Sequence, residues 1–250
     1  MKLPAAFLTR PITHRALHDK TDGRPENSIE AITAAIDAGY AIEIDLQLSK
    51  DGVPMVFHDY HLARLTPEQG PITMRTAAEL GQIPLSGGKA GIPTLAEVLA
   101  LVDGRVPLLI EIKDQDLNMG PNVGSLQQAT ADVLAGYAGD VAVMSFNPHA
   151  VIAFGEAAPH IPRGLVTSSY DPADWEPLAV DLCERLREIP DYDRTGASFI
   201  SHEAHDLDRP RVAELKAAGA NILCWTIKSA EEEAQARKIV DNVTFEGYLA

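Results

Sequence analysis

Alternation of short apolar segments with longer helical patterns is the feature that most constrains the fold of this chain. Eight short apolar runs are expected to be strands: residues 11–14, 41–48, 107–113, 141–146, 164–167, 198–201, 222–227 and 242–245. Stretches with helical spacing are expected between most of them: residues 28–38, 95–102, 125–134, 148–156, 178–187, 211–218 and 230–239. This α/β pattern predicts a parallel sheet, and eight strands suit a closed (β/α)8, or TIM, barrel. An open doubly wound sheet is the alternative, but no GxGxxG or P-loop sequence supports it.

One predicted strand pair interrupts the alternation. Residues 41–48 and 53–58 are separated by four residues that include Asp51-Gly52. A parallel crossover needs a dozen or more residues, so this connection is expected to be a β-hairpin. The hairpin would bring His58 roughly opposite Glu43 and Asp45.

The segment after the hairpin, residues 59–93, has little periodicity and many Gly, Pro and Thr residues. We expect it to be a small insertion within a single catalytic domain of residues 1–250, a length typical of one TIM barrel. Thr94 with Glu97, and Asn27 with Glu30, have the spacing of helix-starting capping boxes.

Two carboxylates share one face of the second predicted strand. Glu43 and Asp45 are two residues apart, so both are expected to point into the barrel, while the apolar residues between them face the helices. Two uncompensated carboxylates in a lumen repel each other, and one tends to take up a proton. A hard divalent cation, Mg²⁺ or Ca²⁺, would resolve the conflict. The alternative is an exposed edge with solvated charges.

The predicted strand at residues 107–113 repeats this pattern. Glu111 and Lys113 share one face of an otherwise apolar run. Because buried charges are costly unless they are paired or bind a metal, Glu111 is a candidate third ligand and Lys113 a candidate anion-binding group. A purely structural ion pair between Lys113 and a carboxylate is the alternative.

Two histidines are expected near these charges. His14 ends the first predicted strand, and the carboxyl ends of strands form the active face of TIM barrels. Together with His58 it suits general acid and base chemistry near neutral pH. Arg15 is a candidate for a bidentate contact with a phosphate group.

Composition limits the partners and the compartment. Net charge is −15, which disfavours nucleic acid. No apolar run is long enough for a membrane span, no polybasic segment is evident, and the apolar N-terminal stretch is shorter than a secretory signal. Two cysteines far apart in the sequence suggest a reducing compartment, so we expect a cytoplasmic protein. The oligomeric state is left open.

The ordered motifs resemble the glycerophosphodiester phosphodiesterase family. They are His14-Arg15, Pro25-Glu26-Asn27-Ser28, Glu43-Ile44-Asp45, Lys50-Asp51-Gly52, His58-Asp59, Glu111-Ile112-Lys113, Ser145-Phe146 and Trp225-Thr226-Ile227. The resemblance extends from about residue 11 to residue 227. It implies a TIM barrel with a small insertion after the His-Asp motif, and hydrolysis of a glycerophosphodiester to sn-glycerol 3-phosphate and an alcohol.

The resemblance also implies a role for each matching residue. Glu43, Asp45 and Glu111 would bind one divalent cation, Mg²⁺ or Ca²⁺. His14 and His58 would be the catalytic acid–base pair. Arg15 and Lys113 would bind phosphate, Glu26 and Asn27 would support the site, and Phe146 and Trp225 would contact the glycerol. Asn27 is equally explained as a helix cap, and the two aromatics as core residues.

Two departures from the family pattern stand out. Ala16 occupies the position after His-Arg where the family usually has Gly, which is expected to make the following loop bulkier. The family often has a Thr-Asp-x-Pro type segment after the last strand. Here the tail contains Glu246, which we do not take as a replacement for that Asp.

Several other residues are expected to be structural. His202 and Glu203 are expected in a surface loop, and the five remaining histidines (His18, His61, His149, His160 and His205) are expected to be exposed. Cys224 is expected to be a small buried residue in a strand.

Alternative functions remain. They are cleavage of lysophospholipids or of phosphoinositol-type diesters on the same barrel, and a non-catalytic barrel that only binds a phosphodiester. The absence of a membrane-binding segment disfavours the first, and the histidine pair disfavours the last.

Overall fold

The strands form a closed parallel barrel in the computed structural model, which describes residues 2–250. The barrel strands are β1 (Ile12–Thr13), β2 (Ala41–Leu48), β4 (Leu108–Ile112), β5 (Val141–Ser145), β6 (Arg163–Thr167), β7 (Phe199–Glu203), β8 (Asn221–Ile227) and β9 (Asn242–Phe245). Each is hydrogen-bonded in parallel to the next, and β1 pairs with both β2 and β9. The sheet therefore has no open edge within the barrel, which confirms the predicted TIM barrel and rules out the open doubly wound sheet.

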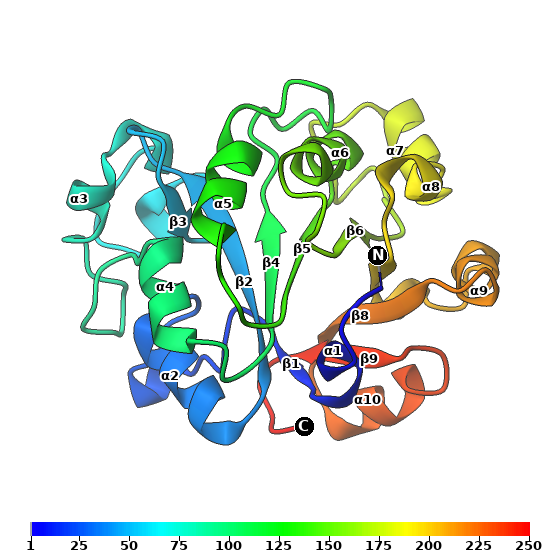
Figure 1. The fold of residues 1–250 in the computed structure, drawn as a ribbon, viewed down its shortest axis with the longest axis horizontal. Coiled ribbons are helices and arrows are strands. Elements are labelled where there is room, and N and C mark those ends of the chain that lie inside the picture. Colours follow the sequence, from blue (N-terminus) through cyan, green and yellow to red (C-terminus); the bar gives the residue numbers. More distant parts are fainter. Residues whose placement is uncertain (1) are drawn as a thin grey trace.

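Helices surround this barrel (Figure 1). They are α2 (Ile29–Ala38), α4 (Leu95–Val102), α5 (Leu126–Leu134), α6 (Pro148–Ala157), α7 (Val180–Arg187), α9 (Pro210–Ala217) and α10 (Ala230–Ala236), which match the predicted helices with small shifts at the ends. The short helices α1 (Ala6–Thr9) and α8 (Tyr192–Thr195) were not predicted. Each spans only about one turn, too short for an apolar period to be recognised.

The alternation of side chains along the strands separates two apolar layers. Ile42, Ile44 and Leu46 of β2 pack outward in one buried cluster with residues of α2 and α4. Inward-facing residues such as Leu109 form a second cluster inside the barrel, which Phe7 of α1 joins from the amino end. Because α1 covers that end, the carboxyl ends of the strands are left as the accessible face of the barrel.

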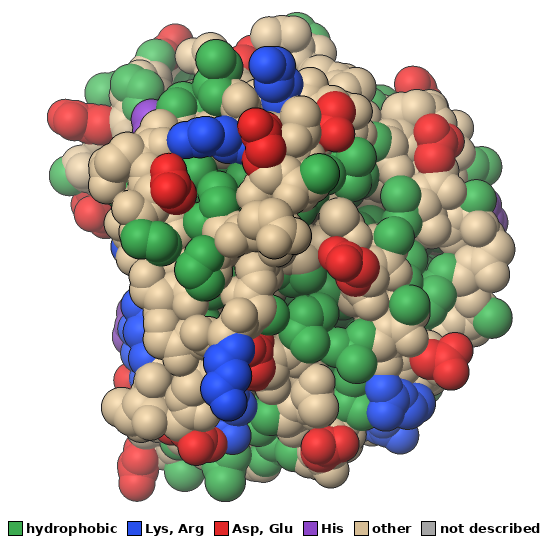
Figure 2. All heavy atoms as spheres, turned by 90° about the vertical axis from the view of Figure 1, so that its left-hand side faces the viewer, with side chains coloured by type: hydrophobic (Ala, Val, Ile, Leu, Met, Phe, Trp, Pro, Cys, Tyr) green, Lys and Arg blue, Asp and Glu red, His purple; other side chains and the backbone are tan. Residues whose placement is uncertain are grey.

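The predicted hairpin is present. β3 (Pro54–Val56) pairs antiparallel with β2, with Leu46 opposite Val56. The segment that follows holds the 3-10 helices η2 (Leu62–Arg64) and η3 (Ile72–Met74) and the short helix α3 (Ala77–Leu80). It has its own apolar cluster and lies at the left of Figure 1, in cyan. On the face in Figure 2, basic side chains are dispersed among acidic and apolar ones rather than gathered in one patch.

The two predicted helix starts have different outcomes. Thr94 caps α4, and its hydroxyl and the Glu97 carboxylate form the expected capping box. The prediction for Asn27 is wrong: Ser28 caps α2 by accepting from the Ala31 amide. Asn27 cannot do so because it has a φ of +59° and its side chain is turned into the barrel. Within residues 2–250, no helix has both the length and the apolarity needed to cross a bilayer.

Three histidine predictions are wrong. His202 lies in β7 rather than in a surface loop, is fully buried, and hydrogen-bonds to Thr167 at 2.8 Å. Its side chain points outward from the barrel into the layer beneath the helices. The predicted strand ends at residue 201, one residue too early to include His202. His18 and His149 are partly buried rather than exposed. Cys224 is buried in β8 as expected.

Candidate active site

Two neighbouring cavities open at the carboxyl ends of the strands. A small cavity of about 60 Å³ is lined by His14, Arg15, Glu43, His58, Glu111, Lys113, Met144, Phe146, Val166, Ser201, Trp225 and Thr244. A wider cavity of about 380 Å³ is lined by His58, Asp59, Tyr60, His61, Glu111, Lys113, Asp114, Met119, Phe146 and Trp175. Because the two share four lining residues, they form one site with an inner and an outer part. A cavity of similar size elsewhere, between η4 (Ala204–Asp206) and α10, contains none of the predicted site residues.

Three carboxylates converge, as predicted: Glu43 and Glu111 line the inner cavity, and Asp45 lies beside both. Glu43 and Asp45 come from β2 and Glu111 comes from β4, where the register places Asp45 beside Glu111. Their side chains are at most 8% exposed, and one oxygen of each lies within 4.8 Å of the others. The alternative of an exposed edge with solvated charges, considered for Glu43 and Asp45, is therefore excluded.

Two cations adjoin this cluster. The Lys113 Nζ atom lies 2.7 Å from Asp45 Oδ1 and 2.6 Å from Glu111 Oε1. The Arg15 backbone N–H donates to Glu43 Oε2 at 2.8 Å, and its guanidinium lies 3.6 Å from Asp45. The ion pair between Lys113 and a carboxylate, which was the alternative to an anion-binding role, thus exists, and it lies within the candidate site rather than apart from it.

The two cations do not fully neutralise the three carboxylates. Burial, and then the charges of Asp45 and Glu111, raise the pKa of Glu43 well above its usual range. Burial acts in the same direction on Asp45, but the positive charges of Lys113, His58 and Arg15 together outweigh it and hold the pKa of Asp45 far below its usual range. One carboxylate therefore prefers to be protonated unless a further positive charge is present.

The donor set fits a divalent cation. Three buried carboxylates offer the hard oxygen ligands that Mg²⁺ and Ca²⁺ prefer, and they lie close enough together to bind one ion. A cation would also remove the repulsion that raises the pKa of Glu43. Within residues 2–250, no cysteine or histidine joins this group of three carboxylates, as expected for a hard ion rather than a soft one.

Asn27 and Glu26 lie behind the cavity and support its residues. The buried Asn27 side chain donates to Asp45 Oδ2 at 2.8 Å, so it supports the site rather than capping α2. Glu26 accepts from Arg15 at 2.9 Å and from both terminal nitrogens of Arg64 at 2.8 Å. The methyl group of Ala16 is buried in the outer apolar core, so it does not project into the entrance.

Both predicted catalytic imidazoles are held by a carboxylate. His58 Nδ1 lies 2.7 Å from Asp59 Oδ1, and Arg64 in turn binds both oxygens of Asp59 at 2.7 Å. His14 Nδ1 lies 2.7 Å from Glu246 Oε2. A carboxylate on Nδ1 leaves the opposite ring nitrogen, Nε2, available in each histidine.

Aromatic rings continue from the inner cavity to the outer one. Phe146 packs edge-on against Trp225 with ring centroids 5.6 Å apart, and against Trp175 at 5.0 Å. The Ser201 and Thr244 hydroxyls line the inner cavity, are almost fully buried, and have no hydrogen-bond partner among the described residues. An unpaired buried hydroxyl is costly, so a polar ligand group at this wall would be favoured.

Several of these residues are not predicted from the sequence. No recognisable motif contains Arg64, Trp175 or Ser201, so nothing in the local sequence places them at the site. Glu246 was discounted, although its position directly after the last predicted strand is where barrel sites are built.

Known proteins resemble this chain in fold and in sequence. A phosphodiesterase of Oleispira antarctica, in complex with the product sn-glycerol-3-phosphate, has a TM-score of 0.74 and 27% identity, and the match covers 96% of this chain and 94% of that chain. A glycerophosphodiester phosphodiesterase of Caldanaerobacter subterraneus subsp. tengcongensis is 32% identical over 153 residues, 57% of this chain and 61% of that protein. One of Bacillus subtilis is 28% identical over 217 residues, 80% of this chain and 70% of that protein.

The fold and the site together define a phosphoric diester hydrolase built on a TIM barrel. The sequence profile of the glycerophosphoryl diester phosphodiesterase family matches residues 14–244. The chain belongs to this family.

Proposed function

We propose that this protein hydrolyses glycerophosphodiesters to sn-glycerol 3-phosphate and an alcohol, with the help of one divalent cation. The observation that carries the proposal is the convergence of two carboxylate-held imidazoles and a cluster of three buried carboxylates, two of which line the same cavity as the imidazoles. Relatives named as glycerophosphodiester phosphodiesterases, and a similar structure that holds sn-glycerol-3-phosphate, support the choice of substrate.

Glu43, Asp45 and Glu111 would hold the cation, Mg²⁺ or Ca²⁺. When bound, the ion would offset the negative charge of the phosphodiester and polarise its phosphorus–oxygen bonds. Arg15 and Lys113 line the same cavity and would bind the phosphate oxygens, where positive charge stabilises the charge that develops during cleavage.

His14 and His58 would move the protons. One imidazole takes the proton from the attacking oxygen, and the other donates a proton to the departing alcohol oxygen. The attacking oxygen belongs either to water or to the neighbouring glycerol hydroxyl, which would form a transient cyclic phosphate. The carboxylates on Nδ1 keep both Nε2 atoms free for this exchange.

The inner cavity would take the glycerol end of the substrate and the outer cavity the alcohol. Phe146 and Trp225 would cover the carbon atoms of the glycerol, and the unpaired hydroxyls of Ser201 and Thr244 would hydrogen-bond to its hydroxyl groups. The wider cavity, with Trp175 at its wall, would accept alcohols of different sizes. A single catalytic unit with residues 59–93 as an insertion, and a cytoplasmic location, remain predictions.

The first prediction tests the reaction itself. Purified protein with Mg²⁺ or Ca²⁺ is expected to release sn-glycerol 3-phosphate from glycerophosphocholine, and to lose this activity after chelation. A coupled assay for sn-glycerol 3-phosphate measures both. Faster turnover of a lysophospholipid or of glycerophosphoinositol would favour the corresponding alternative, and binding without product would identify a non-catalytic barrel.

A second prediction concerns the glycerol contact. Thr244→Val keeps the shape of the side chain and removes its hydroxyl, so kcat/KM for glycerophosphocholine is expected to fall about tenfold, the value of one lost hydrogen bond. Two analogues of glycerophosphocholine, each lacking one of the two free glycerol hydroxyls, serve as further substrates. The analogue that lacks the hydroxyl bound by Thr244 should be hydrolysed equally by Thr244→Val and by the unmodified protein. The melting temperature should not fall, because the hydroxyl has no hydrogen-bond partner in the part of the chain that the structure describes.

Thr33→Val, on the exposed face of α2, is the control and should leave kcat/KM unchanged. An equal loss on all three substrates would contradict the proposed contact of Thr244.

A further inference from the structure

Glu246 meets His14 because the barrel closes between β1 and β9. The two strands run parallel with Thr13 beside Phe245, and the His14 amide donates to the Phe245 carbonyl at 2.8 Å. The residues that follow the two strands, His14 and Glu246, are therefore level with each other. Their side chains are 15% and 22% exposed, so the contact is shielded from most of the solvent.

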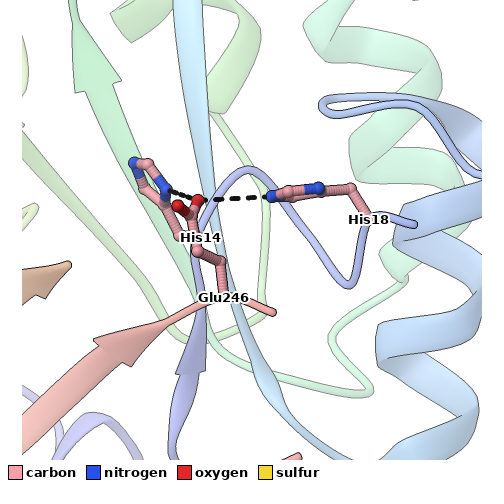
Figure 3. Close-up of side chains that lie close together, drawn as sticks. All are labelled: His14, His18 and Glu246. Carbon is pink, nitrogen blue, oxygen red and sulfur yellow. Dashed lines mark hydrogen bonds and ion pairs between the residues drawn. The ribbon is translucent and has the colours of Figure 1, made fainter. Parts of the chain in front are cut away.

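Three positively charged or protonatable groups surround the Glu246 carboxylate. His14 Nδ1 lies 2.7 Å from Oε2, and His18 Nε2 approaches the same oxygen from the opposite side at 3.4 Å (Figure 3). Lys228 Nζ lies 3.2 Å from the other oxygen, Oε1. The hydrogen bond with His14, and then the nearby His18 imidazole, lower the pKa of Glu246 well below its usual range, so this carboxylate is ionised and can only accept.

We propose that Glu246 is a positioning residue that acts through His14. Its carboxylate accepts the Nδ1 proton of His14, which selects one tautomer and directs the unprotonated Nε2 into the inner cavity. His18 and Lys228 hold the carboxylate in place from the sides that His14 leaves open. The inference rests on the proposed function, in which His14 is one of the two catalytic imidazoles, and it names Glu246 as the residue that orients His14.

A metal site made of the same three residues is the rival explanation, since one ligand atom of each lies within 4.8 Å of the others. Two distances favour the positioning role. Ligands of one tetrahedral zinc ion lie about 3.3 Å apart at bond lengths of about 2.0 Å, whereas His14 and Glu246 are 2.7 Å apart, at hydrogen-bond distance. The Lys228 ammonium on the same carboxylate also opposes a second cation.

Glu246→Gln tests the role. The amide has the same shape but can donate to Nδ1, which allows the opposite tautomer. We expect kcat on glycerophosphocholine to fall by about 10²-fold, within the usual range for impaired acid–base catalysis, with little change in KM. ¹⁵N NMR of His14 should show Nδ1 protonated in the unmodified protein and a shift toward Nε2 protonation in the variant.

Controls separate this inference from the proposed function. Glu231→Gln, an exposed substitution in α10, should leave kcat and the tautomer unchanged. If the unmodified protein has no phosphodiesterase activity, the proposed function fails, but the NMR tautomer still tests the contact. An unchanged tautomer or kcat in Glu246→Gln would overturn the role. Stoichiometric Zn²⁺ binding that His18→Gln abolishes would also overturn it, in favour of a metal site.

Discussion

Replacement of His58 by alanine is expected to lower kcat by about 10³-fold, because general acid or base catalysis by one side chain typically contributes 10²- to 10⁴-fold. The imidazole lines both cavities and is held by Asp59 at 2.7 Å, so it lies between the glycerol and alcohol ends of the proposed substrate. Its side chain is 30% exposed, and its removal leaves no buried void. The loss should therefore appear in kcat rather than in stability.

Metal binding distinguishes loss of the acid–base group from loss of the site. A titration with Mg²⁺ or Ca²⁺, followed by calorimetry, should give the same affinity for His58→Ala and the unmodified protein, since the three carboxylates remain. His160→Ala, an exposed substitution on the loop after α6, is the matched control and should retain full activity. Full activity of His58→Ala would remove this residue from the mechanism.

The second large effect is expected for Glu43→Gln. Loss of a hydrogen-bonding partner of a metal ligand typically weakens metal affinity 10- to 100-fold, so loss of a ligand itself should weaken it by about 10²-fold or more. Activity at a fixed low concentration of metal should fall in proportion, and excess metal should restore part of it. Direct titration of the metal measures the first effect, and initial rates at several metal concentrations measure the second.

Although Glu43→Gln should weaken metal binding, it should not lower the stability of the protein without metal. The neighbouring charges of Asp45 and Glu111, together with burial, raise the pKa of Glu43, so a neutral amide at this position removes a repulsion. Glu43→Gln is therefore expected to melt at an equal or higher temperature than the unmodified protein in the presence of a chelator, and to gain less on adding metal. Glu156→Gln, exposed on α6, should change neither quantity. An unchanged metal affinity in Glu43→Gln would contradict the ligand assignment.

Arg64 links the two halves of the site. It binds both oxygens of Glu26, which holds Arg15, and both oxygens of Asp59, which holds His58. Partial burial raises the pKa of Asp59, but hydrogen bonds with His58 and Arg64 lower it further than burial raises it. The Asp59 carboxylate therefore stays ionised. The segment after the hairpin thus contributes to the geometry of the barrel site, through Arg64 and through Asp59, Tyr60 and His61, which line the outer cavity.

Local patterns in the sequence determined the fold class and the core of the candidate site. A period of two along β2 and β4 is enough to place Glu43, Asp45 and Glu111 inside the barrel, because successive side chains of a strand point to opposite faces. The short connection after β2 is enough to bring His58 back toward them, since so few residues between two strands allow only a hairpin. Such relations depend on neighbours in the chain and need no knowledge of the tertiary structure.

Contacts between distant segments were decided only by the closed barrel. Glu246 and His14 are 232 residues apart, and they meet because β9 pairs with β1 in a register that no local pattern encodes. The same holds for Arg64, whose partner Glu26 is 38 residues away, and for the unpaired hydroxyl of Thr244, whose inward direction depends on the register of β9. The periodicity of a strand determines which side chains share a face, but the residues they meet are determined by strand pairing and loop packing, which depend on the whole chain.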